Sequence, residues 1–129
     1  MAAVLATRPP VLVLDEPTTG QDWRQSLEMM DLAQRLNAAG HTVIVITHNM
    51  QIVARYARRV IVLARGTVLI DGPPEAVFTQ PDLLASTFLE PPQVTQLAQS
   101  LPGLPRDILD VDRLVVELAS RLVKARKVG

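Results

Sequence analysis

The chain has no cysteine, no net charge and no long apolar run. The absence of cysteine excludes disulfides and thiolate metal sites. Because the sequence also shows no pattern of a secretory leader, the expected compartment is the reducing cytoplasm. Thirteen Lys and Arg balance thirteen Asp and Glu, so total charge gives no reason to expect a nucleic-acid or anionic-membrane partner. No apolar run approaches the roughly 18 residues of a membrane span. Any membrane attachment is therefore expected to go through a partner protein.

What the chain does have is the composition of a globular domain, in which short apolar strands alternate with helical patterns. Val11–Leu14 is a continuous apolar run, and Thr42–Thr47 repeats the pattern with Val43–Ile46; both are typical of strands buried on both faces of a parallel sheet. Between them, Asp22–Ala39 carries apolar residues at helical spacing, and Gly40 supplies a stop. Because this interval suits a right-handed crossover, we expect the two strands to be parallel.

Beyond the second strand, the pattern predicts two short helices and a hairpin. Two β-rich runs flank Arg65-Gly66, which is typical of a tight hairpin turn. Asp71-Gly72-Pro73-Pro74 then breaks the sheet pattern, and proline fits the first turn of a following helix. The expected elements are a helix near Gln51–Ala57, strands at Val60–Ala64 and Thr67–Ile70, and a helix near Pro74–Phe78.

Proline-rich stretches punctuate the remainder and place a boundary at about Glu90. We therefore predict a domain over residues 1–90 and a helical extension over residues 91–129, with helices near Gln93–Ser100 and Asp112–Lys127. The apolar residues of this tail either pack into a core or form a dimer contact: Ile108, Leu109, Val111, Leu114, Val115, Leu118, Leu122 and Val123.

Two adjacent acids, Asp15 and Glu16, follow the first predicted strand. The carboxyl edge of a parallel sheet is where open α/β folds bind ligands. In nucleotide hydrolysis, Asp15 would hold Mg²⁺ directly or through water, and Glu16 would orient or deprotonate the attacking water. Read alone, the pair is explained as well by a solvated turn or a helix cap.

Two ordered motifs resemble those of ABC ATPases. Val11-Leu-Val-Leu-Asp-Glu-Pro-Thr-Thr-Gly-Gln-Asp22 resembles the Walker B segment running into the D-loop, and Val43-Ile-Val-Ile-Thr-His48 resembles the next strand and the H-loop. This resemblance implies ATP and Mg²⁺ as cofactors, Asp15 as the Mg²⁺ and nucleotide-binding residue, and Glu16 and His48 as catalytic residues. A histidine there can donate a hydrogen bond to a γ-phosphate oxygen. Read alone, His48 is a histidine at the surface or one whose hydrogen bonds are made within the protein.

Neighbouring positions have simpler interpretations beside the one that the resemblance implies. Asp22 matches the D-loop aspartate, which in this family helps to join the nucleotide sites of a head-to-tail dimer, but it also suits an N-cap of the predicted helix. Gly20 suits a turn with unusual backbone angles. His41 is expected to be a polar turn residue. Asn49 stands where this family commonly has an aspartate, directly after the H-loop histidine, which is His48 here.

Other ABC ATPase motifs are missing from the sequence. It contains no G-x-x-x-x-G-K phosphate loop, no Leu-Ser-Gly-Gly-Gln signature and no glutamine loop, and Met1–Arg8 resembles the end of the helix that follows the signature. The expected fold is therefore α/β: a partial P-loop NTPase (ABC ATPase) domain with parallel strands, a β-hairpin and a helical C-terminal tail. Lacking the phosphate loop, the chain alone is expected to hydrolyse ATP poorly, and its incomplete sheet to expose an edge.

The hairpin region Arg59–Gly72 and Pro73–Phe78 also look like the elements that follow the H-loop in transport ATPases. The sequence Glu-Pro-Thr-Thr-Gly-Gln-Asp at residues 16–22 and the tail from Pro91 to Val111 most resemble the ATPases of energy-coupling factor transporters, which import vitamins or transition-metal ions. This resemblance implies a second ATPase subunit as dimer partner, a membrane-spanning subunit, and a peripheral position on the cytoplasmic face of the cell membrane.

Two alternatives remain open at this stage. The absent phosphate loop favours a non-catalytic fragment that pairs with an intact ATPase. A soluble ABC protein of DNA repair or translation would share Glu16 and His48 but need no transporter, although the neutral charge and the tail count against it.

Overall fold

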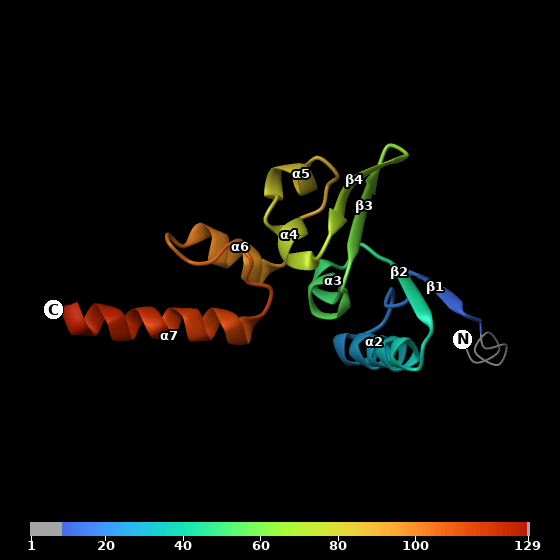
Figure 1. Cartoon of the computed structure of the whole chain (residues 1–129), viewed down its shortest axis with the longest axis horizontal. Coiled ribbons are helices and arrows are strands. Elements are labelled where there is room, and N and C mark those ends of the chain that lie inside the picture. The colour runs from blue at the N-terminus through green and yellow to red at the C-terminus, as the bar shows by residue number, and fades with distance from the viewer. Residues whose placement is uncertain (1–8, 129) are drawn as a thin grey trace. The chain divides into compact units, whose positions relative to one another are not determined.

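The computed structural model describes residues 9–128, with side chains as far as Val123 (Figure 1). It consists of two compact units, divided between Asn49 and Met50. The domain boundary predicted at about Glu90 lies within the second unit and stays a prediction. The helix end predicted for Met1–Arg8 lies outside the described residues.

The first unit is built on two parallel strands joined by a helix. Strands β1 (Val11–Asp15) and β2 (Thr42–Ile46) pair in parallel, in a register that sets Asp15 opposite Ile46. Helix α2 (Trp23–Ala38) forms the connection and lies along one face of the pair (Figure 1). This arrangement confirms the predicted strand–helix–strand order and the parallel pairing.

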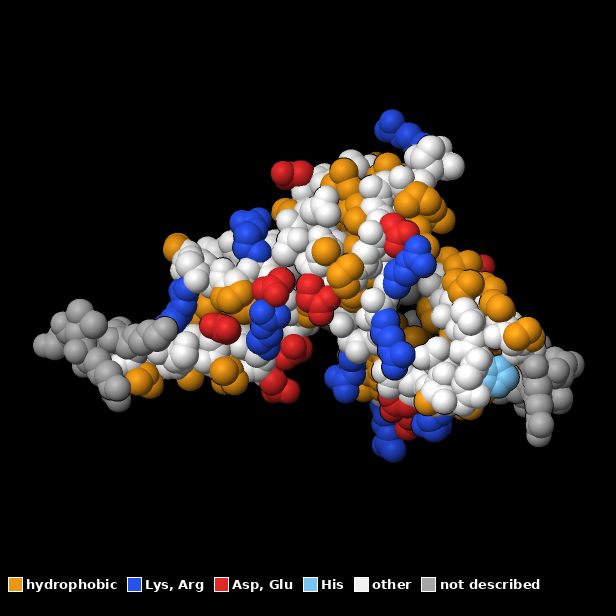
Figure 2. Space-filling view, in the orientation of Figure 1, with side chains coloured by type: hydrophobic (Ala, Val, Ile, Leu, Met, Phe, Trp, Pro, Cys, Tyr) orange, Lys and Arg blue, Asp and Glu red, His pale blue; other side chains and the backbone are white. Residues whose placement is uncertain are grey.

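Among the described residues of this unit, 9–49, one face of the sheet is covered and the other is half exposed, so the prediction that both strands are buried on both faces is wrong there. Leu12 from β1 and Met30 and Ala33 from α2 are buried between sheet and helix. On the other face four apolar side chains are about half exposed: Val11, Val13, Ile44 and Ile46. Figure 2 shows hydrophobic side chains gathered on the surface of this part of the molecule. Within residues 9–49, α2 is the only helix available to cover the strands.

Helix α2 has the start and stop that its sequence predicts. The Asp22 carboxylate accepts a hydrogen bond from the amide of Gln25 at 2.8 Å, which makes Asp22 the N-cap. After the last turn, Gly40 has a φ of +100° and its amide donates to the Asn37 carbonyl at 3.0 Å. A residue with a side chain is strained at this angle, so glycine suits the stop.

Replacing Asp22 by alanine is expected to lower the free energy of unfolding by about 1 kcal/mol, the usual cost of losing an N-cap acceptor. An asparagine side chain would retain an acceptor oxygen, so Asp22→Asn is the matched control and should lose much less. Urea unfolding followed by circular dichroism measures both. Equal losses in the two variants would show that charge at this position, rather than capping, stabilises the unit.

The second unit combines a hairpin with five helices in its described part. The hairpin is antiparallel and turns at Arg65 and Gly66, whose φ values of 50° and 76° are both positive, as a type I′ turn requires. The helix at Pro81 was not predicted, because its single five-residue turn carries no periodic pattern. The elements are α3 (Met50–Tyr56), β3 (Val60–Ala64), β4 (Thr67–Gly72), α4 (Pro74–Phe78), α5 (Pro81–Ala85), α6 (Gln93–Ser100) and α7 (Val111–Val128).

Two apolar clusters hold this unit together. The first joins the hairpin to α4 and α5 through Val62, Ile70, Val77, Phe78 and Leu84. The second lies between α6 and α7 and contains Ala98, Leu104, Ile108 and Leu114. The apolar residues of the tail are therefore divided: Ile108 and Leu114 are buried, whereas Val111, Val115, Leu122 and Val123 are exposed. No helix within residues 9–128 is both long and apolar enough to cross a membrane.

Candidate active site

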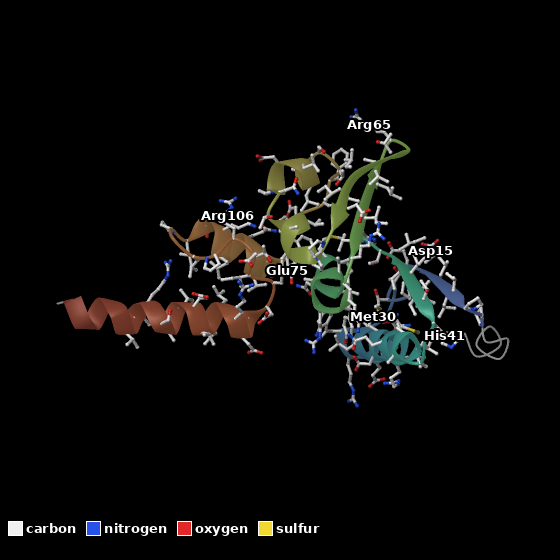
Figure 3. All side chains as sticks on the ribbon, in the orientation of Figure 1. Asp15, Met30, His41, Arg65, Glu75 and Arg106 are labelled. Atoms are coloured by element: carbon white, nitrogen blue, oxygen red, sulfur yellow. The ribbon has the colours of Figure 1, made fainter. Side chains whose placement is uncertain are left out.

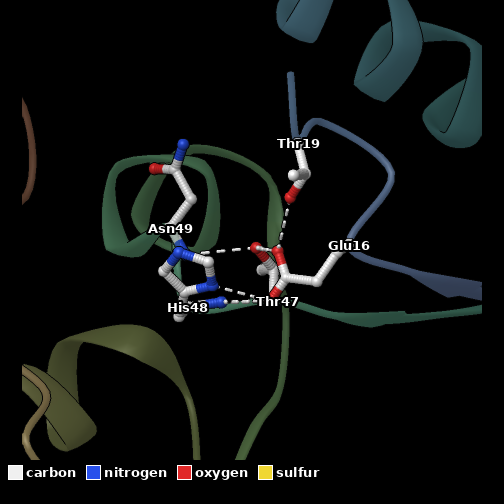
Figure 4. A network of polar contacts seen from close by, with 5 residues as sticks. All are labelled: Glu16, Thr19, Thr47, His48 and Asn49. Atoms are coloured by element: carbon white, nitrogen blue, oxygen red, sulfur yellow. Dashed lines mark hydrogen bonds and ion pairs between the residues drawn. The ribbon is translucent and has the colours of Figure 1, made fainter. Parts of the chain in front are cut away.

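Glu16 leaves β1 in an unusual backbone conformation. Its amide still donates to the Ile46 carbonyl at 2.9 Å, but its φ is +44°, in the left-handed region. A non-glycine residue there costs on the order of 1 kcal/mol. The turn continues through the Thr19 amide, which donates to the Glu16 carbonyl at 3.1 Å. In this conformation the Glu16 side chain lies across the end of β2 (Figure 4).

The Glu16 carboxylate accepts four hydrogen bonds from described residues (Figure 4). Its Oε1 accepts from the His48 amide at 3.2 Å and lies 2.7 Å from Nδ1 of the His48 ring. Its Oε2 accepts from the hydroxyls of Thr47 at 3.2 Å and Thr19 at 3.3 Å. A carboxylate has about four acceptor positions, so a water molecule has to displace one of these donors to reach it.

These contacts also keep Glu16 ionised. The hydrogen bond from the His48 ring is the largest influence and lowers the pKa of Glu16 below its ordinary 4.5. Desolvation opposes this shift, whereas the charge of His48, the Thr47 hydroxyl and the His48 amide add to it. The carboxylate is about one third exposed and the imidazole mostly exposed, so the pair is accessible to a ligand.

The other two predicted site residues lie outside this network. Asp15 ends β1, exposed and without a side-chain partner among the described residues (Figure 3). Its free carboxylate offers the hard oxygen ligands that Mg²⁺ prefers. Within residues 9–128, no three acidic or histidine side chains gather into a complete metal cage, and Mg²⁺ typically takes one or two carboxylates together with substrate phosphates. Asp22 is occupied as the cap of α2.

Comparisons with known proteins agree with the motifs. Over 108 residues, the chain is 44% identical to an ABC transporter ATP-binding protein of Methanosarcina acetivorans, a match that covers 84% of this chain and 18% of that protein. Over 113 residues, it is 42% identical to the energy-coupling factor transporter ATP-binding protein EcfA2 of Streptococcus pyogenes, covering 86% and 40%. The chain is related to ABC ATPases. It spans two fifths or less of the length of these relatives.

The fold leads to the same family. The solved structure of cbiO1 from Clostridium perfringens, described as part of the ABC transporter complex cbiONQ, matches with a TM-score of 0.57 and 35% identity, covering 76% of this chain and 39% of that one. The α/β fold class predicted from the ABC ATPase motifs is therefore confirmed. No family model matches the chain.

Within the ABC ATPase motifs, sequence reasoning singled out Glu16 and His48, which the structure brings into contact, but missed the two threonines that bind the carboxylate. Both threonines stand in the motif segments, three residues after Glu16 and one before His48. The spacing of Thr19 is that of a local turn and could have indicated a contact. Thr47 is 31 positions from Glu16, and only the parallel register, which brings the ends of β1 and β2 together, predicts their meeting.

His41 and Asn49 have structural contacts of their own. His41 lies at the other end of the strands from Asp15, and its Nδ1 is 2.6 Å from the Pro9 carbonyl oxygen (Figure 3). It therefore links the turn after α2 to the start of β1, a more defined place than the polar turn position predicted for it. The Asn49 amide donates to the Thr47 hydroxyl at 3.1 Å.

The Glu16 contacts predict a pH dependence of stability. Because the pKa of Glu16 is lowered in the folded chain, the unfolded chain binds more protons in acid, and this contribution is present above about pH 4.5 and lost as the pH falls through the lower folded value. The difference in unfolding free energy between the wild type and Glu16→Gln should therefore shrink in acid. Urea unfolding between about pH 3 and 7 measures it. A difference that grows as the pH falls would contradict the assignment.

Proposed function

We propose that Asp15, Glu16 and His48 are the hydrolytic part of an ATP site in an ABC ATPase subunit that drives an importer of the energy-coupling factor type. The observation that carries this proposal is the contact between Glu16 and His48 at the carboxyl ends of two parallel strands, where Glu16 Oε1 lies 2.7 Å from His48 Nδ1. An acid and a histidine from different strands meet at the edge of the sheet where such folds bind ligands.

Each residue has a distinct part in this proposal. Bound Mg²⁺-ATP supplies the phosphoryl group to be transferred and the cation that neutralises its charge. Asp15 would hold the cation, and its carboxylate, which is exposed and has no side-chain partner among the described residues, fits this role. Glu16, whose lowered pKa makes it a weak base, orients the attacking water by accepting its hydrogen bond. His48 turns its ring from Glu16 toward the phosphate and donates to an oxygen on which charge develops.

The transport role draws its support from the named relatives. One is an energy-coupling factor transporter ATP-binding protein, and the structural relative is described as part of a transporter complex. We propose that the protein pairs with a second ATPase subunit and a membrane-spanning subunit, is peripheral on the cytoplasmic face of the membrane, and powers uptake of a vitamin or a transition-metal ion. Asp22 would then contact the second subunit from the start of α2, where its carboxylate is exposed.

A chimaera tests the proposed function. The segment of this chain that matches Streptococcus pyogenes EcfA2 replaces the corresponding segment of that protein, which is expected to supply the phosphate loop and the signature, and the product is assayed in the same assembly as its parent. We expect Mg²⁺-dependent ATP hydrolysis. A folded chimaera that binds ATP without hydrolysing it would instead favour the non-catalytic alternative, a fragment that pairs with an intact ATPase.

A further inference from the structure

We propose that Thr47 is a positioning residue that aims the Glu16 carboxylate during ATP hydrolysis, an inference that rests on the proposed function of Glu16. The Thr47 hydroxyl joins the two loops of the site, because it comes from the end of β2 and reaches a carboxylate at the end of β1 (Figure 4). Both oxygens of Glu16 have partners, but the partners differ in how firmly they are placed.

The Thr47 hydroxyl is oriented on both sides. Its oxygen accepts a hydrogen bond from the Asn49 amide at 3.1 Å, and its proton is donated to Glu16 Oε2 at 3.2 Å. A threonine hydroxyl has a single proton, so an accepted bond on the oxygen helps to fix the direction in which that proton points. Thr47 is also partly buried at the end of a strand and has the restricted χ1 of a β-branched residue.

The other two side-chain donors are less suited to hold the carboxylate through a reaction, and the remaining donor, the His48 amide, binds only Oε1. Thr19 lies on an exposed loop and donates at 3.3 Å, the longest of the four bonds. The His48 ring holds Oε1 here, but in the proposed mechanism it leaves to donate to the phosphate. Thr47 donates to the other oxygen, Oε2, so this hydrogen bond does not depend on the position of the His48 ring. It can keep the carboxylate aimed while the departing ring frees an acceptor position on Oε1 for water, beside the bond from the His48 amide.

Three variants of the chimaera test this role. Thr47→Val keeps the shape of the side chain without its hydroxyl, and we expect kcat to fall about tenfold or more, the loss typical of removing a hydrogen bond to a charged group, with KM unchanged. Thr47→Ser restores the hydroxyl and should restore kcat. Thr42→Val, the matched control, makes the same change at the exposed start of β2 and should leave kcat unchanged. Equal kcat in wild type and Thr47→Val, or an equal loss in Thr47→Ser, would overturn the proposal.

Glu16→Gln in the same chimaera separates this inference from the function on which it rests. If Glu16→Gln lowers turnover and Thr47→Val does not, Thr47 has no positioning role and the function stands. If Glu16→Gln leaves turnover unchanged, the proposed function itself fails. In the 129-residue chain, the ¹³C shift of the Glu16 carboxyl, measured by NMR at one neutral pH, should change in Thr47→Val and return in Thr47→Ser. An unchanged carboxyl shift in Thr47→Val would contradict the contact.

Discussion

Replacing Glu16 by glutamine is expected to lower the turnover of the chimaera about 10²–10⁴-fold, the range over which a positioned acid or base contributes to a reaction. Glutamine has nearly the same shape but no charge, and a donating amide group replaces one of the two carboxylate oxygens, so it orients the attacking water less well. Affinity for Mg²⁺-ATP should be unchanged, because the proposed cation ligand, Asp15, and the remaining phosphate contacts stay in place. Steady-state phosphate release and calorimetric titration with Mg²⁺-ATP measure the two effects separately.

Glu28→Gln is the matched control for this variant. Glu28 lies in the same unit on α2, where it is exposed and paired with Arg24 at 3.1 Å, and it has no contact with the Glu16 network. The same chemical change there should leave turnover unchanged, since an exposed ion pair of this kind contributes little. If Glu16→Gln turned over ATP as fast as Glu28→Gln, Glu16 would not be the residue that orients the water.

Removing the ring of His48 is the second change with a large expected effect. In His48→Ala, turnover of the chimaera should fall about 10²–10³-fold, the usual cost of losing one donor to an oxygen that becomes charged. The same variant removes the largest influence on Glu16, so the pKa of Glu16 should rise toward its ordinary 4.5. Phosphate release measures the first effect, and ¹³C NMR of the Glu16 carboxyl during an acid titration measures the second.

His41→Ala controls for the loss of a histidine as such. His41 bonds to the Pro9 carbonyl at the far end of the strands, so its removal should lower stability while leaving the turnover of folded protein unchanged. A drop in turnover as large in His41→Ala as in His48→Ala would mean that the effect of His48 is structural.

Much of the fold was predictable because it depends on local patterns. Three features each depend on a few adjacent residues: the apolar runs of β1 and β2, the capping aspartate at Asp22 and the positive-φ turn at Gly66. The contact between Glu16 and His48 was also within reach, since parallel strands end at the same edge and the ABC ATPase motifs place these side chains there.

Other features depend on tertiary structure and could not be read from the sequence. Whether Val13 or Ile44 is covered depends on which elements pack against the sheet, and an apolar run is the same either way. The left-handed φ of Glu16 has no sequence signal, because glycine is the usual residue at such an angle. The orientation of the Thr47 hydroxyl depends on both Glu16 and the Asn49 amide, which only the folded chain brings together.

The central claim is that Glu16 enables the chemical step of ATP hydrolysis, and the state of the nucleotide held by the Glu16→Gln chimaera tests it most directly. Radiolabelled ATP is bound with Mg²⁺, and the nucleotide recovered from the protein is separated by chromatography. We predict that ATP is recovered intact from the variant, whereas the unmodified chimaera yields ADP. Recovery of ADP from Glu16→Gln at the rate of the unmodified chimaera would contradict the claim.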